Sequence, residues 1–315
     1  MSQTDFPDLL TPSEVLAQVA EALPPDTRGD VIIIGSLAAG YHFFAGDGAK
    51  AIRTKDVDVL FSPHAKAVAA AVEVTERLLA ADWTQRQDAR WGAPGGTGDA
   101  DDDLPMVRLR PPAAAGASGQ WFLELLSAPP QYEPGGPGKK IKRLRTSVGD
   151  FAICSFDYLA LTEWRPLPTR HGVRIARPEM MALSNLLHHS AISDTLIAGT
   201  DLKRSNKDLG RVLALAYLTA ARDRRDGHDE LGQWASRMWE ALQAKFGSHA
   251  RVLALGAGTG IDALLGSPLD LAQALRIANL GLLASLDLGL DAMLATGRRL
   301  RAEVLAPLTE LAGGA

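Results

Sequence analysis

Two segments decide the fold: VIIIGS at residues 31–36 and DVDVLF at residues 56–61. The first is a short β-branched run that ends in Gly35-Ser36. It predicts a buried strand, a tight turn and a helix over the small residues that follow. The second alternates acidic and apolar residues. Because side chains two apart in a strand point the same way, we expect Asp56 and Asp58 on one face and the apolar residues on the other.

Further strands and helices are predicted on both sides of these segments. A capping-box pattern, Thr11-Pro12-Ser13-Glu14, predicts a first helix, and residues 67–81 have the composition of another. Residues 106–110 and 121–127 are predicted as an antiparallel pair of strands with a long turn between them. The second strand carries Glu124 between two leucines.

The second half of the chain is predicted to be helical from Pro178 onward, over residues 179–190, 207–222, 229–246 and 268 to the end. The glycine pattern at residues 253–260 is interpreted as a turn between helices rather than a dinucleotide-binding loop. The predicted fold class is therefore α/β (α+β), a mixed sheet with flanking helices plus a C-terminal helical domain. We place the catalytic domain at residues 1–177 and the helical domain at 178–315.

Composition narrows the function classes. The 315 residues carry 33 Lys and Arg against 37 Asp and Glu, a net charge of −4, which excludes nucleic-acid binding driven by the charge of the whole chain. Cys154 is the only cysteine, which excludes an internal disulfide and fits a reducing compartment. Residues 1–10 have no secretory pattern, and charges interrupt the apolar stretch 269–294, so we expect a cytoplasmic protein without a membrane role.

Asp56, Asp58 and Glu124 form the most informative set of polar residues. Magnesium takes oxygen ligands and is usually held by a few carboxylates together with substrate phosphates. Three acids on neighbouring strands are therefore expected to hold two magnesium ions. Glu124 has an alternative interpretation, as a carboxylate at the strand edge paired with Arg108 or Arg110.

The Gly35-Ser36 turn is predicted to bind phosphate. It opens a predicted helix directly after an apolar strand. Helix N-termini present backbone N–H groups and the positive end of the helix dipole, both of which favour anions. The turn and the acids together point to nucleotide phosphates.

This combination resembles the nucleotidyltransferase superfamily related to DNA polymerase beta, whose motif is a hydrophobic residue followed by Gly-Ser, then Asp-hydrophobic-Asp and a later lone acid. Residues 35–39 and 53–58 look most like the branch containing abortive-infection and toxin–antitoxin nucleotidyltransferases. PEMMAL at 178–183 and KRSNKDL at 203–209 are similar to the second half of those proteins.

The resemblance implies an activity and assigns residues to it. It implies metal-dependent transfer of a nucleoside monophosphate from a nucleoside triphosphate such as ATP to a hydroxyl acceptor, with pyrophosphate release. The first two acids would bind the metals and the third would activate the attacking hydroxyl. It also implies an antitoxin protein as a partner. The nucleotide-binding residues would be Gly35, Ser36, Thr54, Lys55, Lys207 and Asp208.

A basic run after a loop rich in Pro and Gly suggests what the acceptor is. Its positive residues could neutralise RNA phosphates next to the active site, and the alternative is a solvated loop. The residues are Lys139, Lys140, Lys142, Arg143 and Arg145.

Two other functions stay open. Asn185 stands where the related proteins tend to place a lysine, which favours a catalytically silent nucleotide-binding module. A nucleotidyltransferase acting on a small molecule, of the antibiotic-modifying kind, is the other alternative. The arrangement of the three carboxyl groups discriminates between an active and a silent site.

Overall fold

The computed structural model describes residues 9–47, 50–86, 93–112, 121–129, 131–133, 139–192, 195–197 and 199–314. The chain divides into two compact units, Met1–Ala176 and Arg177–Ala315. The first is built around a mixed sheet and the second is helical, so the predicted α/β class with an added helical region is confirmed.

The first unit contains three α-helices among its described residues, α1 (Pro12–Ala22), α2 (Gly35–Phe44) and α3 (His64–Ala80). It also contains the short helices η2 (Arg28–Asp30), η3 (Asp101–Asp103) and η5 (Asp157–Glu163). Its strands are β1 (Leu9–Leu10), β2 (Val31–Ile34), β3 (Ile52–Arg53), β4 (Asp56–Phe61), β5 (Thr84–Gln85), β6 (Arg108–Arg110), β7 (Phe122–Ser127), β8 (Lys139–Thr146), β9 (Gly149–Phe156), β10 (Leu167–Pro168) and β11 (Arg174–Ile175).

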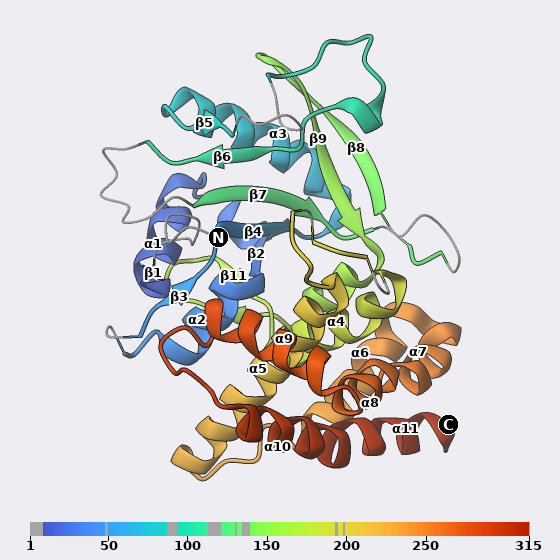
Figure 1. Cartoon of the computed structure of the whole chain (residues 1–315). Coiled ribbons are helices and arrows are strands. Elements are labelled where there is room, and N and C mark those ends of the chain that lie inside the picture. Colours follow the sequence, from blue (N-terminus) through green and yellow to red (C-terminus); the bar gives the residue numbers. More distant parts are fainter. Residues whose placement is uncertain are drawn as a thin grey trace. The chain divides into compact units, whose positions relative to one another are not determined.

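The described part of the first unit holds a nine-stranded sheet with β4 and β7 near its centre (Figure 1). The strand order is β10-β11-β2-β4-β7-β6-β5, and β9 also pairs with β7 and carries β8. β4 is antiparallel to β2 and parallel to β7, while β6 is antiparallel to β7 as predicted. β1 and β3 form a separate two-stranded sheet.

The predicted segments 31–36 and 56–61 form the elements expected of them. β2 is buried along its whole length, and Gly35 opens α2 directly after it. In β4 the apolar residues Val57 and Val59 are fully buried. The nineteen residues between Ser36 and Asp56 (37–55) hold the remainder of α2 and the short strand β3.

Three predictions about the first unit are wrong in detail. Thr11 precedes α1, but its side chain makes no capping hydrogen bond, so the capping box does not form. The basic run at residues 139–145 is not a loop: it lies in β8, an eight-residue strand paired throughout with β9. The strand predicted over residues 106–110 begins only at Arg108 in β6. Met106 instead makes an isolated bridge to Ala152.

The second unit is made of helices among its described residues. These are α4 (Pro178–Ile192), α5 (Arg204–Asp226), α6 (Trp234–Phe246), η6 (Gly247–His249), α7 (Ala250–Gly256), α8 (Thr259–Leu265), α9 (Pro268–Leu280), α10 (Leu290–Leu300), the π-helix η7 (Arg301–Leu305) and α11 (Ala306–Gly313). The glycine pattern at 253–260 lies in α7, the following turn and the start of α8, so only its middle is an interhelical turn.

The core of the second unit follows the apolar stripe visible in the sequence. Trp234, Met238 and Leu242 of α6 are each no more than 1% exposed. Within the described residues no one helix is both long and apolar enough to cross a membrane. Helices from Trp234 to Leu280 pass that test only as a pair bent by 102° at a break.

Candidate active site

Asp56 and Asp58 lie on one face of the sheet. Both are half-buried, while the alternating residue Val57 is fully buried on the opposite face. The register places Glu124 of β7 beside Asp58, and parallel partners in register point to the same face. The prediction that these acids share one face is therefore confirmed by the pleat and the register.

The Gly35-Ser36 turn meets this acidic face at Asp58. Ile34, the last residue of β2, is the register partner of Asp58. Gly35 has φ of +70°, a left-handed conformation that favours glycine. A Cβ on this residue would lie 2.6 Å from Oδ2 of Asp58. The carboxylate of Asp58 thus lies against the N-terminus of α2, where the helix dipole favours negative charge.

Glu124 is held by Arg108. An Nη2 of Arg108 lies 2.9 Å from Oε2 of Glu124 and donates a hydrogen bond of 3.0 Å to Oε1. The two residues are register partners on β6 and β7, and their side chains are 19% and 12% exposed. The alternative interpretation of Glu124, as a carboxylate paired with Arg108, is confirmed. Burial raises the pKa of Glu124, and Arg108 offsets part of that rise.

An aromatic ring and a second arginine border the same face. Phe122 is the register partner of Asp56, so its side chain lies on the same face as this aspartate. The guanidinium carbons of Arg86 and Arg108 lie 4.6 Å and 5.4 Å from the centroid of this ring. Sequence reasoning missed Arg86, because nothing in the sequence indicates that the short strand β5 pairs with β6 and brings this residue to the site.

The two magnesium ions expected at Asp56, Asp58 and Glu124 stay a prediction. Within the described ranges, no three Asp, Glu, His or Cys side chains gather into a group that could hold a metal ion. Asp56 and Asp58 still supply two carboxylates on one face, and magnesium bound by two carboxylates takes its other ligands from phosphates and water. Cys154 is buried on β9, and burial raises the pKa of its thiol to about 11.

The other residues assigned from the motif lie around β4. Thr54 Oγ1 donates a 2.9 Å hydrogen bond to the backbone oxygen of Asp56 and accepts one of 3.3 Å from its N–H, which fixes the start of the strand. The side chain of Lys55 is exposed, and its backbone oxygen accepts a hydrogen bond from Phe122. Ser36 is half-buried in the first turn of α2.

Lys207 and Asp208 lie on α5, in the second unit. Asp208 is 6% exposed, and its Oδ2 lies 2.8 Å from Nδ1 of His188. Asn185 of α4 donates a 2.7 Å hydrogen bond to the backbone oxygen of Met181. The local contacts of Asp208 and Asn185 are structural, and nucleotide binding by Lys207 and Asp208 stays a prediction.

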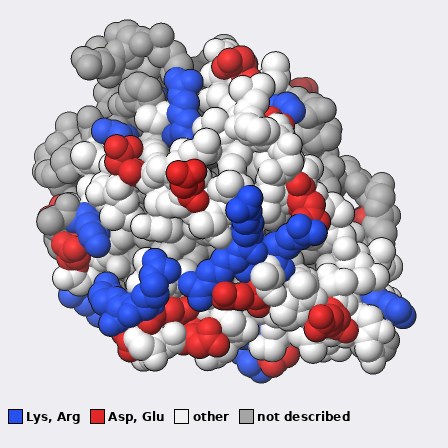
Figure 2. Space-filling model, turned by 60° about the horizontal axis from the view of Figure 1, so that its bottom comes forward, with Lys and Arg blue, Asp and Glu red and all other residues white. Residues whose placement is uncertain are grey.

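The basic run does not form one surface. Alternation along β8 places Lys139, Arg143 and Arg145 on one face of the strand and Lys140 and Lys142 on the other. Figure 2 shows one face of the molecule, on which Lys and Arg side chains lie among Asp and Glu side chains. RNA binding by the basic run therefore stays a prediction, and its residues would have to act from two faces.

Residues of the basic run also have partners within the chain. Arg143 lies 2.8 Å from Oδ1 of Asp101 and 2.5 Å from Oδ2 of Asp150, and it also donates to the backbone oxygens of Gly96 and Asp99. Lys140 lies 3.0 Å from Oε2 of Glu133, and Lys142 lies 3.1 Å from Nε2 of His64. Arg143 thus fastens the acidic segment around η3 to the sheet.

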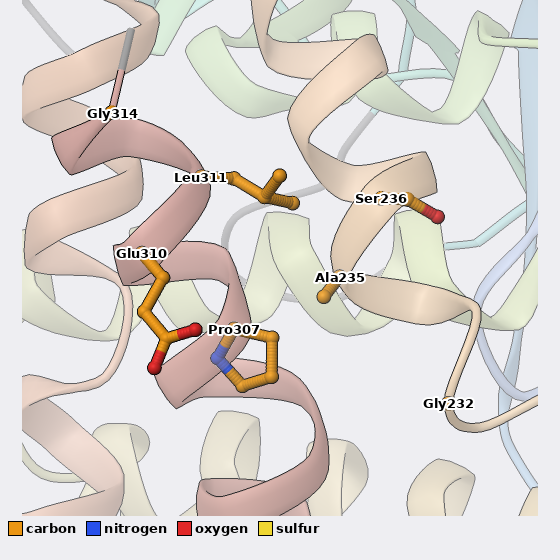
Figure 3. A pocket seen from close by; sticks show the side chains of 7 residues that line it. All are labelled: Gly232, Ala235, Ser236, Pro307, Glu310, Leu311 and Gly314. Carbon is orange, nitrogen blue, oxygen red and sulfur yellow. The ribbon is translucent and has the colours of Figure 1, made fainter.

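An open groove of about 500 Å³ lies elsewhere, within the second unit (Figure 3). Pro307 and Leu311 of α11 face Ala235 of α6 across it. It contains none of the residues that the sequence assigns to catalysis or nucleotide binding. Its lining residues are Gly232, Ala235, Ser236, Pro307, Glu310, Leu311 and Gly314.

Comparisons with known proteins do not identify a family for this chain. No family model matches the chain, and no curated protein sequence is similar to it. A solved structure of an antigenic nucleotidyltransferase-like protein from Paracoccidioides brasiliensis is similar, with 16% sequence identity and a TM-score of 0.36. The similarity covers 86% of this chain and 95% of that one. At this TM-score the likeness carries no argument, so the site is interpreted from its own residues.

Proposed function

We propose that the chain is a nucleotidyltransferase that moves a nucleoside monophosphate from a nucleoside triphosphate to a hydroxyl acceptor. One observation carries the proposal: Asp56 and Asp58 share a face of β4, and the carboxylate of Asp58 lies against the glycine that opens α2. Carboxylates beside a helix N-terminus offer a place where a divalent cation and a polyphosphate can bind together.

The reaction forms a bond between the acceptor oxygen and the α-phosphorus, and it breaks the bond between that phosphorus and the bridging oxygen to the β-phosphate. Pyrophosphate carries the electron pair of the broken bond away, and the acceptor hydroxyl loses its proton to solvent water. A bound divalent cation would supply charge neutralisation at the phosphates and a fixed geometry for in-line attack.

The residues of the chain have distinct tasks in this scheme. Asp56 and Asp58 hold the cation, and the backbone at Gly35 and Ser36 binds the phosphates at the start of α2. Side chains at positions 35 and 36 are small, so backbone N–H groups are accessible to a polyphosphate. Glu124 is the acid nearest the two aspartates in the register, and its pairing with Arg108 leaves it no direct part in holding that cation.

The experiment is a transfer assay with each labelled nucleoside triphosphate and Mg²⁺, using total RNA and a panel of small hydroxylated compounds as acceptors. Pyrophosphate release and label on the acceptor are both measured. Asp58→Asn should lower transfer at least about a thousandfold, because one charge and one ligand are lost together. Asp26→Asn, a change at an exposed aspartate of the same unit, is the matched control.

Unchanged transfer in a folded Asp58→Asn variant contradicts the proposal. Transfer that is absent from the parent with every acceptor, while the parent binds triphosphate, supports instead the silent nucleotide-binding module. Label on a small compound and none on RNA supports the small-molecule alternative.

A further inference from the structure

The Arg108–Glu124 ion pair places a fixed positive charge at the edge of the acidic face. Arg108 lies opposite Glu124, and Glu124 lies opposite Asp58, so the three residues form one row across strands β6, β7 and β4. Strands are about 4.8 Å apart in this direction. The guanidinium therefore belongs to the same site as the aspartates, one strand beyond the third acid.

The contacts of Arg108 hold it in this position. Both oxygens of Glu124 lie within 3.0 Å of its Nη2, and its guanidinium also lies over the ring of Phe122. Its Nε is buried without a hydrogen-bond partner. An arginine held on a buried carboxylate and an aromatic ring is not a mobile surface charge, since leaving the pair would expose an unpaired carboxylate to a partly buried environment.

We propose that Arg108 takes the place of a second metal ion in this site. Two-metal sites need a set of acids that reaches both ions, and Glu124 would be the acid that completes such a set. Arg108 already neutralises it. The site then binds a single divalent cation through Asp56 and Asp58, and the guanidinium supplies the second positive charge on the acceptor side. Glu124 is the positioning residue here, because its carboxylate holds the guanidinium of Arg108 in place.

This inference rests on the proposed function for the identity of the cation site, but it is tested without turnover. Mn²⁺, which carries an electron-spin resonance signal that disappears on binding, is titrated into the full-length protein. The parent should bind one Mn²⁺ per chain. Arg108→Gln, which removes the cation paired with the Glu124 carboxylate, should bind a second Mn²⁺.

Matched variants separate the roles of these residues. Arg110→Gln, at an exposed position two residues along the same strand, should still bind one Mn²⁺. The double variant Arg108→Gln/Glu124→Gln should return to one. Glu124→Gln alone should leave the dissociation constant for Mn²⁺ within about twofold of the parent, since this residue is not a ligand in the parent.

Two bound Mn²⁺ in the parent, or a loss of binding in Glu124→Gln, overturns the inference. If Arg108→Gln does not fold, the number of Mn²⁺ bound by the parent and the affinity of Glu124→Gln still decide the inference. One Mn²⁺ with the expected pattern of variants, but no cleavage of any triphosphate, rejects the proposed function and leaves the inference standing. A parent that binds no Mn²⁺ overturns both.

Discussion

The acidic residues of β4 and the basic residues of β8 are both clusters of like charge in the sequence, but the strands distribute their side chains differently between the two faces. Asp56 and Asp58 are two residues apart, so the pleat puts both on one face, and the register adds Glu124 beside them. The basic residues of β8 occupy odd and even positions and are divided between faces. The two aspartates thus gather on one face, whereas the basic residues of β8 are divided between two faces.

The sharpest test of this comparison changes two charges in each region. Asp56→Asn/Asp58→Asn should abolish Mn²⁺ binding and triphosphate cleavage, because both proposed ligands are lost. Lys140→Ala/Lys142→Ala should leave Mn²⁺ binding within about twofold of the parent. Titration calorimetry with Mn²⁺ and a pyrophosphate-release assay measure the two effects, and equal losses in both variants would contradict the comparison.

The second test concerns the contact that joins the turn to the acids. Gly35→Ala forces a Cβ to within 2.6 Å of the Asp58 carboxylate at a φ of +70°. We expect unfolding free energy to fall by about 1–3 kcal/mol and Mn²⁺ affinity to fall with it. Gly29→Ala, where an added Cβ would meet nothing within 4 Å, is the control for chemical denaturation. If Gly35→Ala keeps the parent's stability and Mn²⁺ affinity, the Gly35-Ser36 turn is not part of the proposed site.

The third test asks what Arg143 does on β8. Arg143→Gln removes its ion pairs with Asp101 and Asp150, so the segment around η3 should become more accessible to protease and Tm should fall. Arg145→Gln, on the same face of the strand but exposed, should change neither quantity. Limited proteolysis with mass-spectrometric mapping of residues 93–103 checks this. Equal behaviour of the two variants would show that Arg143 is not a structural residue.

The smallest expected effect is on RNA. If RNA binds at all, Lys140→Ala/Lys142→Ala should change the slope of log affinity against log salt by less than about one unit, because these side chains contact Glu133 and His64. A filter-binding series over salt concentration measures the slope. A change of about two units would show that both lysines contact phosphates and would restore the basic run as an RNA-binding surface.

The sequence predicted the central part of the fold well, because the evidence there is local. The β-branched run before Gly35 and the alternation from Asp56 identify β2 and β4 within single windows of sequence. The pairing of Glu124 could be narrowed only to Arg108 or Arg110. These arginines are on the same face of one strand, and only the register of β6 on β7 decides between them.

Other features escaped prediction because they depend on contacts far apart in sequence. The sequence does not predict β8 as a strand: its basic run was interpreted as an RNA-binding segment, with a solvated loop as the alternative. Its strand forms through pairing with β9 along eight residue pairs. Arg86 joins the site through β5, a two-residue strand with no pattern of its own. In the second unit the helices could be predicted from the helical spacing of their apolar residues. The predicted and observed helix ends differ by several residues.

The place of β8 at the border of the sheet gives its positive residues another consequence. Among the described strands β8 pairs with β9 alone, so its outer side presents backbone groups that another chain could pair with. A row of lysines and arginines on such a strand repels an identical strand and discourages intermolecular sheet growth. Replacing them by uncharged β-formers would then favour aggregation, an effect on solubility that has nothing to do with nucleic acid.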